Sequence, residues 1–157
     1  MTSVLAHDHG YAIATSGNVF ISVWKEPSTL ERLDHVRACQ QKLVDGAPDG
    51  IVVLTVLMDT SFKVDSNVRD KAAGIARQFA AATRAHAYVI EGSGFRTAAM
   101  RAVIAGINAF VRTGHPVRVF GDMPSAIGWL RTQAGAAFDV AQLDEAVAGA
   151  RSALRPS

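Results

Sequence analysis

The hydrophobic and polar positions of the chain follow two periods, which together predict short strands connected by amphipathic helices. Residues 11–15 and 19–24 are β-prone runs, and the small residues 16–18 between them are typical of a hairpin turn. Residues 51–58 are nearly all apolar and rich in β-branched side chains, which is the pattern of a strand buried on both faces. We expect two further short strands, at residues 87–90 and 117–120.

Apolar residues at helical spacing predict helices between and after these strands. In the first helix the apolar stripe consists of Leu30, Leu33, Val36, Cys39 and Leu43. Ser28 or Thr29 is expected to cap this helix, with Glu31 completing a capping box on Ser28, and Gly46 to end it. Similar stripes predict helices within residues 68–82, 100–111, 127–130 and 138–154.

The resulting order of elements predicts one α/β domain. Strands that alternate with helices favour a single layered domain with a mixed, mostly parallel sheet, here of about four or five strands flanked by about four or five helices. We expect residues 1–10 to form a flexible N-terminal tail and residues 11–133 the α/β domain itself. Residues 134–157 are expected to be a helical extension of the same domain.

The composition agrees with a folded domain and excludes several classes of protein. Of 157 residues, 49% are hydrophobic and 19% are charged, which supplies a core and argues against disorder. The 16 Lys and Arg against 14 Asp and Glu leave a net charge of +2 without a basic stripe, so we expect no nucleic-acid partner. No apolar run is long enough for a membrane span and the N-terminus lacks a signal-peptide core, so a cytoplasmic bacterial protein is expected.

The elements and several residues within them resemble the STAS domain, the fold of the SpoIIAA-like anti-sigma-factor antagonists. The resemblance covers about residues 19–130 and rests on the opening hairpin, the buried strand at residues 51–58 and the run 116–120 that leads into a helix. The segment 91–96, Glu-Gly-Ser-Gly-Phe-Arg, followed by a helix rich in Ala, Val and Ile, is also similar to bacterial members of that superfamily. The resemblance implies a regulatory module that binds another protein.

A candidate phosphorylation site and partner face lies at Asp65, Ser66 and Asn67. In the phosphorylatable members of the family, an Asp-Ser pair opens the helix after the central strand, and a partner kinase modifies the serine; Asp65-Ser66 stands in that place. The family pattern continues with a small residue, glycine and leucine, from which this chain departs at Asn67 and the two residues that follow. Phosphate at a helix N-terminus would meet free backbone N–H groups, whereas the alternative is that Ser66 or Asp65 only caps the helix.

A second candidate is an anion- or ligand-binding turn at Gly92, Ser93, Gly94 and Arg96. Glycines between a strand and a helix let backbone N–H groups approach an anion, and the Arg96 guanidinium could add a bidentate contact. The pattern is neither a Walker loop, nor a dinucleotide fingerprint, nor a nucleophile elbow. The alternative is a tight turn in which glycine supplies a positive φ.

The remaining reactive side chains give no further site. The five histidines, at positions 7, 9, 35, 86 and 115, lack the spacing of a zinc site, so each is assigned a surface or turn role and no metal or cofactor is expected. Cys39 is the only cysteine, which excludes an internal disulfide, and its place on the apolar stripe favours an inert thiol. The arginines 96, 101, 112 and 118 are assigned to a solvated face.

The resemblance implies a non-enzymatic regulatory module that binds another protein and is tuned by phosphorylation, and the lack of a catalytic constellation in the sequence permits this class. The alternative is a binder of a small apolar or anionic ligand near Gly92-Ser93-Gly94, and an enzyme is the least favoured class. The apolar surface of the last helix and of the helix over residues 100–111 also favours a homodimer.

Overall fold

The protein is an α/β domain built on one mixed sheet. The computed structural model describes residues 2–58, 65–91, 98, 101–102, 114–134 and 139–154. The strands are β1 (Thr2–His7), β2 (Tyr11–Ser16), β3 (Val19–Trp24), β4 (Ile51–Leu57), β5 (Thr83–Ile90) and β6 (Val117–Phe120). The helices are α1 (Leu30–Asp45), α2 (Ser66–Gln78), α4 (Met123–Ala134) and α5 (Val140–Ala153), with a short 3₁₀ turn η1 (Ala80–Ala82) before β5.

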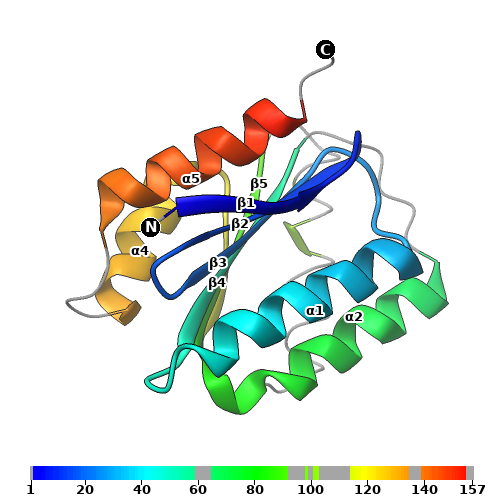
Figure 1. Cartoon of the computed structure of the whole chain (residues 1–157), viewed down its shortest axis with the longest axis horizontal. Coiled ribbons are helices and arrows are strands. Elements are labelled where there is room, and N and C mark those ends of the chain that lie inside the picture. The colour runs from blue at the N-terminus through cyan, green and yellow to red at the C-terminus, as the bar shows by residue number, and fades with distance from the viewer. Residues whose placement is uncertain are drawn as a thin grey trace.

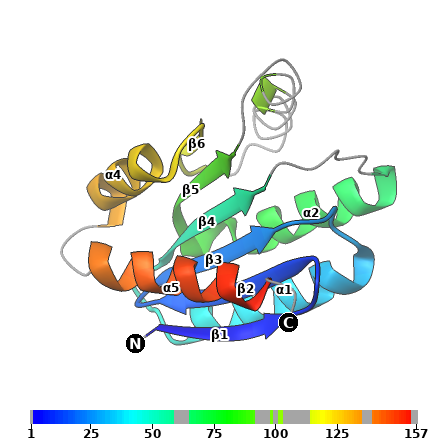
Figure 2. The ribbon, with the colours of Figure 1, turned by 90° about the horizontal axis from the view of Figure 1, so that it is seen from above.

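The six strands lie in the sheet in the same order as in the chain, from β1 at one edge to β6 at the other (Figure 2). The first three form an antiparallel meander, and Gly17 takes a positive φ of 57° in the hairpin turn between β2 and β3. From β3 onward the strands pair in parallel. The connections β3–α1–β4 and β4–α2–β5 each lead to the next strand in the same direction across the sheet. Because such connections are right-handed, α1 and α2 lie on the same face.

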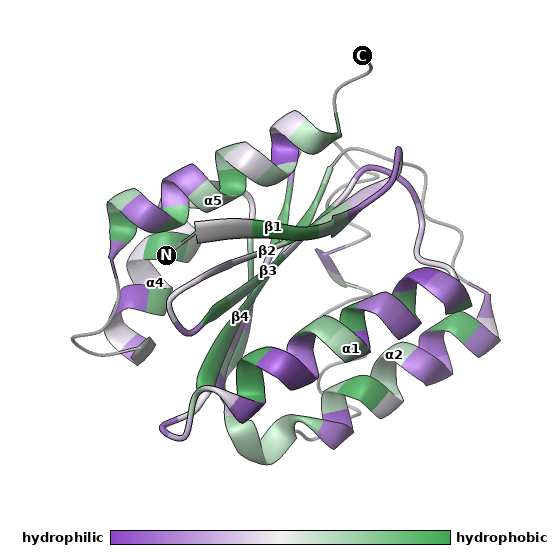
Figure 3. Ribbon diagram, viewed as in Figure 1, coloured by the Kyte–Doolittle hydropathy of each residue, from purple (hydrophilic) through white to green (hydrophobic). Residues whose placement is uncertain are grey.

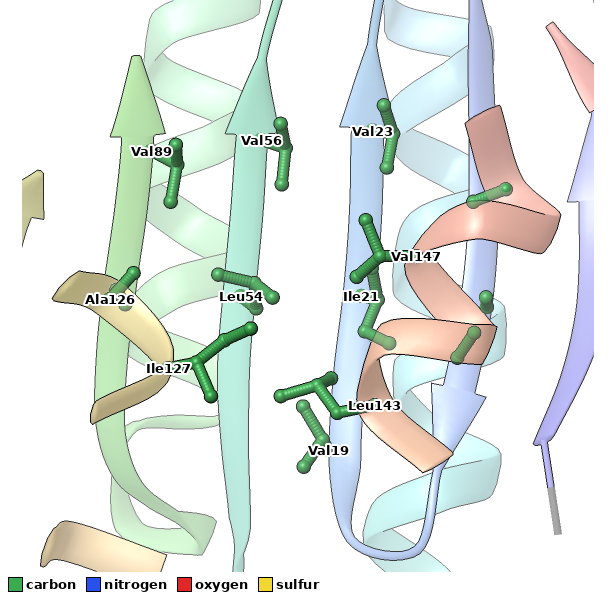
Figure 4. Packing of buried hydrophobic residues seen from close by; sticks show 14 of the residues in the cluster. Val19, Ile21, Val23, Leu54, Val56, Val89, Ala126, Ile127, Leu143 and Val147 are labelled. Atoms are coloured by element: carbon green, nitrogen blue, oxygen red, sulfur yellow. The ribbon is translucent and has the colours of Figure 1, made fainter. Parts of the chain in front are cut away.

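Helices cover both faces of the sheet, α1 and α2 on one side and α4 and α5 on the other (Figure 1). Alternate residues of β4 therefore enter two separate cores: Val52, Leu54 and Val56 face α4 and α5, whereas Ile51, Val53 and Leu57 face α1 and α2. In the first core Leu54 lies opposite Ile127 of α4 (Figure 4). The strands, above all β4, are accordingly hydrophobic along most of their length (Figure 3).

The predicted α/β class and the positions of most elements agree with the structure, whereas the sheet differs from the prediction. It has six strands instead of four or five, and two of its pairings are antiparallel, so it is less parallel than expected. The sixth strand comes from the segment assigned to a flexible tail, because residues 2–7 pair with β2 as edge strand β1. The predicted helix over residues 100–111 falls almost wholly outside the described residues.

The first helix turns most of its predicted apolar stripe to the core shared with α2: Leu33 and Val36 are buried there, and Cys39 and Leu43 pack against it. Thr29, and not Ser28, is its N-cap, and the Thr29 side chain accepts a hydrogen bond from the Arg32 amide at 3.1 Å. Leu30, expected on the apolar stripe, is 46% exposed, whereas Arg32 is only 9% exposed. The predicted end at Gly46 is confirmed.

Arg32 is buried because it ties the start of α1 to the sheet. Its Nε donates to Asp8 at 2.9 Å, its Nη2 to Glu26 at 3.1 Å and its Nη1 to the Pro27 carbonyl at 3.0 Å. Gly10 allows this approach, since a Cβ at that position would come within 2.5 Å of Nη2. Burial alone would raise the pKa of Asp8, but the hydrogen bonds from the Gly10 amide and from Arg32 outweigh it, and the pKa lies below its usual value.

We expect Arg32→Met to lower the free energy of unfolding by about 2 kcal/mol, because it removes charge-assisted hydrogen bonds and leaves Asp8 and Glu26 without their cation. The matched control is Arg37→Met on the same helix, where the arginine side chain is 52% exposed and its pair with Asp34 is 3.5 Å long. That variant should stay within about 0.5 kcal/mol of the parent chain. Urea unfolding with a shared m-value measures both, and equal midpoints for the two variants would contradict the structural role of Arg32.

Candidate functional site

The carboxyl edge of the sheet brings together most of the polar groups that connect one element to another. Because β2 is antiparallel to both of its neighbours, β1 and β3–β6 all run in the same direction and end at this edge. In open α/β sheets, small ligands commonly bind beyond the carboxyl ends of the parallel strands. The N-terminal ends of α1 and α2 lie side by side at this edge, on the right of Figure 1.

The candidate triplet Asp65, Ser66 and Asn67 forms the start of α2. The Asp65 carboxylate caps the helix, accepting from the Val68 amide at 3.0 Å, so the capping alternative holds for Asp65. Ser66 is the first residue of the helix, and both Ser66 and Asn67 are exposed. The cap acceptor is therefore supplied by the neighbouring aspartate, and the Ser66 hydroxyl lies on an accessible surface.

An ion pair connects α2 to α1 near the start of both helices, close to Ser66 in the chain. Lys71 Nζ lies 2.6 Å from Asp34 Oδ1. The hydrogen bond from Lys71 holds the pKa of Asp34 below its usual value. Along both helices hydrophilic and hydrophobic residues alternate, as expected of amphipathic helices with one side against the sheet (Figure 3).

Beyond the end of β5, the edge carries two arginines with different surroundings. Arg151 of α5 forms an ion pair with Glu91, the residue after β5, and both side chains are about half-buried. Arg101 donates from Nη2 to the Ile90 carbonyl at 3.3 Å. The predicted ligand turn, Gly92, Ser93, Gly94 and Arg96, lies between these residues in the chain but outside the described residues.

A row of polar side chains crosses the sheet on the face covered by α1 and α2. Ser22 of β3, Thr55 of β4 and Tyr88 of β5 are in register with one another. The Trp24 indole donates to Ser22 Oγ at 3.0 Å, and Thr55 Oγ1 lies 2.9 Å from His86 Nε2. The His86 ring stacks on Tyr88 with 4.2 Å between the ring centroids.

His86 is therefore part of the sheet, and the surface or turn role assigned to it is wrong. Burial, and after it the nearby His115, lowers the pKa of His86 to about 3. Burial also lowers the pKa of His115, whose Nδ1 is enclosed without a hydrogen-bond partner. The sequence carried one signal that His86 lies in a strand and faces the helices α1 and α2. It stands between Ala85 and Ala87, and both of these side chains lie in the core on the opposite face.

The other reactive groups remain unremarkable chemically. Cys39 is partly buried beside the second core, and burial raises the pKa of its thiol, as expected of an inert cysteine. Tyr11 donates to or accepts from His35 Nδ1 at 2.6 Å, and burial raises the pKa of Tyr11, which opposes a phenolate role. Among the described residues, no group of three His, Cys, Asp or Glu side chains is placed to hold a metal ion.

Comparisons with known proteins identify no relative of this chain. No family model, no curated protein and no solved structure matches it. Within the part of the chain that the structure describes, no helix has both the length and the apolar character needed to cross a membrane. The functional conclusion therefore depends on the residues and their geometry.

The histidine pair predicts a loss of stability in mild acid. The unfolded chain binds a proton at His86 near its ordinary pKa of 6.5, whereas the folded chain binds it only near 3. The free energy of unfolding should therefore fall as the pH is lowered from 6.5 towards 3, by about 1 kcal/mol for each pH unit. Urea unfolding at a series of pH values measures this slope.

His86→Gln should flatten this dependence, because it removes the titrating group and retains a partner for Thr55. The matched control is His9→Gln, since the His9 side chain is 79% exposed and should leave the slope as it is in the parent chain. A slope that is the same in His86→Gln and in the parent chain would show that other groups cause the acid instability.

Proposed function

We propose that the protein is a non-enzymatic regulatory module that binds another protein through the start of α2 and the adjoining surface of α1, with Ser66 as the position at which phosphorylation tunes binding. The observation that carries the proposal is the exposure of Ser66 at the first helical position while Asp65 supplies the cap. A hydroxyl placed in this way can be modified without removing a hydrogen bond that the helix needs. The resemblance to the STAS domain supports the same class of function.

A phosphate on Ser66 would act mainly on the surface charge. It adds a charge of about −1.5 to −2, and the positive end of the helix dipole favours an anion at this position. Arg69 and Asp70 are exposed one turn further along α2, so the new charge would have one attractive and one repulsive neighbour. The fold should consequently persist while the electrostatic potential that a partner meets becomes more negative.

The test is affinity capture with the purified chain as bait, followed by binding measurements on each recovered protein. Ser66→Asp imitates part of the phosphate charge. Ser66→Asn introduces a side chain of the same size as that of Asp but without the charge. We expect a recovered partner whose affinity differs by about tenfold between these two variants, because the charge is placed on the binding surface. Phosphopeptide mass spectrometry of the protein from its own cells should find phosphate on Ser66.

Ala141→Asp is the control for position, since it also adds a carboxylate to the exposed first turn of an Asp-capped helix, α5. It should leave the affinity unchanged. If every recovered partner binds the Asp and Asn variants of Ser66 equally, the role of Ser66 is refuted. If no partner is recovered with any bait, the interaction module itself loses its support.

A further inference from the structure

Arg101 lies across the carboxyl ends of two parallel strands. Its Nη2 donates to Ile90, the last residue of β5, at 3.3 Å. On the other side, a Cβ built on Gly121, the residue after β6, would come within 2.7 Å of Nη2 and 3.2 Å of Cζ. The guanidinium therefore packs against the ends of β5 and β6, and the absence of a side chain at Gly121 makes room for it.

Arg101 differs from the other half-buried or buried arginines of the described chain in its partners. Arg32 and Arg151 are each paired with carboxylates. For Arg101 the described residues offer one acceptor, the Ile90 carbonyl, and no carboxylate lies within ion-pair distance. Its Nε is enclosed and has no hydrogen-bond partner. A buried donor of a charged group without a partner costs free energy, which a bound oxyanion would recover.

The carboxylates nearest in sequence are already used by other groups. Glu91 follows the residue that Arg101 contacts, but its carboxylate pairs with Arg151. Asp122 follows Gly121, and its two oxygens accept from the amide and the hydroxyl of Ser125 at 2.8 and 3.0 Å. Among the described residues, neither of these carboxylates is thus free to pair with Arg101, so an anion from outside the chain could take that place.

We propose that Arg101 anchors a binding site for a small-molecule oxyanion, a carboxylate or phosphate group, at the carboxyl ends of β5 and β6. The guanidinium fork matches such groups through parallel charge-assisted hydrogen bonds, and a turn of the side chain away from Ile90 would open Nε to the ligand. The position agrees with the general placement of ligands beyond the carboxyl ends of parallel strands. The site is independent of Ser66 and of the proposed partner surface.

The test is a titration of the whole chain with inorganic phosphate and, in a separate arm, with acetate, each at an ionic strength held constant with sodium chloride. Backbone amide resonances of Gly121 and Glu91 should shift and saturate with at least one of the two anions and not with chloride. If only one of the two anions gives saturating shifts, that anion is the one that the site prefers. No saturating shift with either anion would overturn the proposal.

Two variants test whether Arg101 is the anchor. Arg101→Gln removes the charge, and Gly121→Ala introduces the Cβ that would displace the guanidinium; each should weaken anion binding at least about tenfold. Gly121→Ala also covers the case in which Arg101→Gln does not fold, because Gly121 is exposed and has no positive φ. Arg118→Gln is the control, since Arg118 lies on β6 with its guanidinium 5.2 Å from the Phe120 ring centroid, and it should bind as the parent chain does. Unchanged binding in Gly121→Ala together with a loss in Arg118→Gln would place the anion elsewhere and refute the assignment.

Discussion

The fold depends on the burial of β4 from both sides. Its residues alternate between two cores, and apart from Thr55 none of Ile51–Leu57 is more than 8% exposed. Each fully buried Val, Leu or Ile contributes roughly 1.5–3 kcal/mol relative to exposure, so the free energy that this strand contributes is divided between the two helical layers. Since α1 and α2 are held by one half of β4 and α4 by the other, a change in the strand affects both sides of the molecule.

The polar row across the same sheet fixes how the strands are paired. Ser22, Thr55 and Tyr88 face α1 and α2 in register, and Ser22 and Thr55 have partners on that face, Trp24 and His86. A shift of one residue in the β4 pairing would turn Thr55 into the apolar core on the opposite face. It would also separate the hydroxyl from His86, leaving buried polar groups without hydrogen bonds. The row therefore costs some apolar burial and in return discriminates against misregistered sheets.

Much of this architecture could be predicted from local pattern, because the signals lie within single elements. The run of residues 51–57, the turn at Gly17 and the aspartate before α2 each define an element without reference to distant parts of the chain. Arg32 could not be predicted in the same way, because its partner Asp8 is 24 residues away and a charge on a helix is ordinarily expected in solvent. The strand at residues 2–7 is an edge strand whose Leu5 is 45% exposed, so it lacks the two-sided burial that marks β4.

The candidate site was predicted less completely, for a related reason. The exposed serine beside a capping aspartate follows from the helix start, which is a local feature. Arg101, by contrast, was assigned to a solvated face, because no local feature of the sequence indicates that its guanidinium packs against Ile90 of β5 and Gly121, the residue after β6. Only the parallel pairing of β5 with β6 brings these two positions to the same guanidinium.

The carboxyl edge therefore contains charged groups of two kinds, and the difference determines what each can do. Arg32 with Asp8, Arg151 with Glu91 and Lys71 with Asp34 connect helices to the sheet or to each other. A ligand that used one of these groups would first have to break an internal pair and bear the cost of the partner left behind. Groups without such a partner carry no such cost, so recognition at this edge should concentrate where internal pairing is incomplete. Among the described residues, Arg101 beside the end of β5 is such a group, whereas Ser66 at the start of α2 is uncharged and exposed, so the phosphate proposed there would break no internal ion pair.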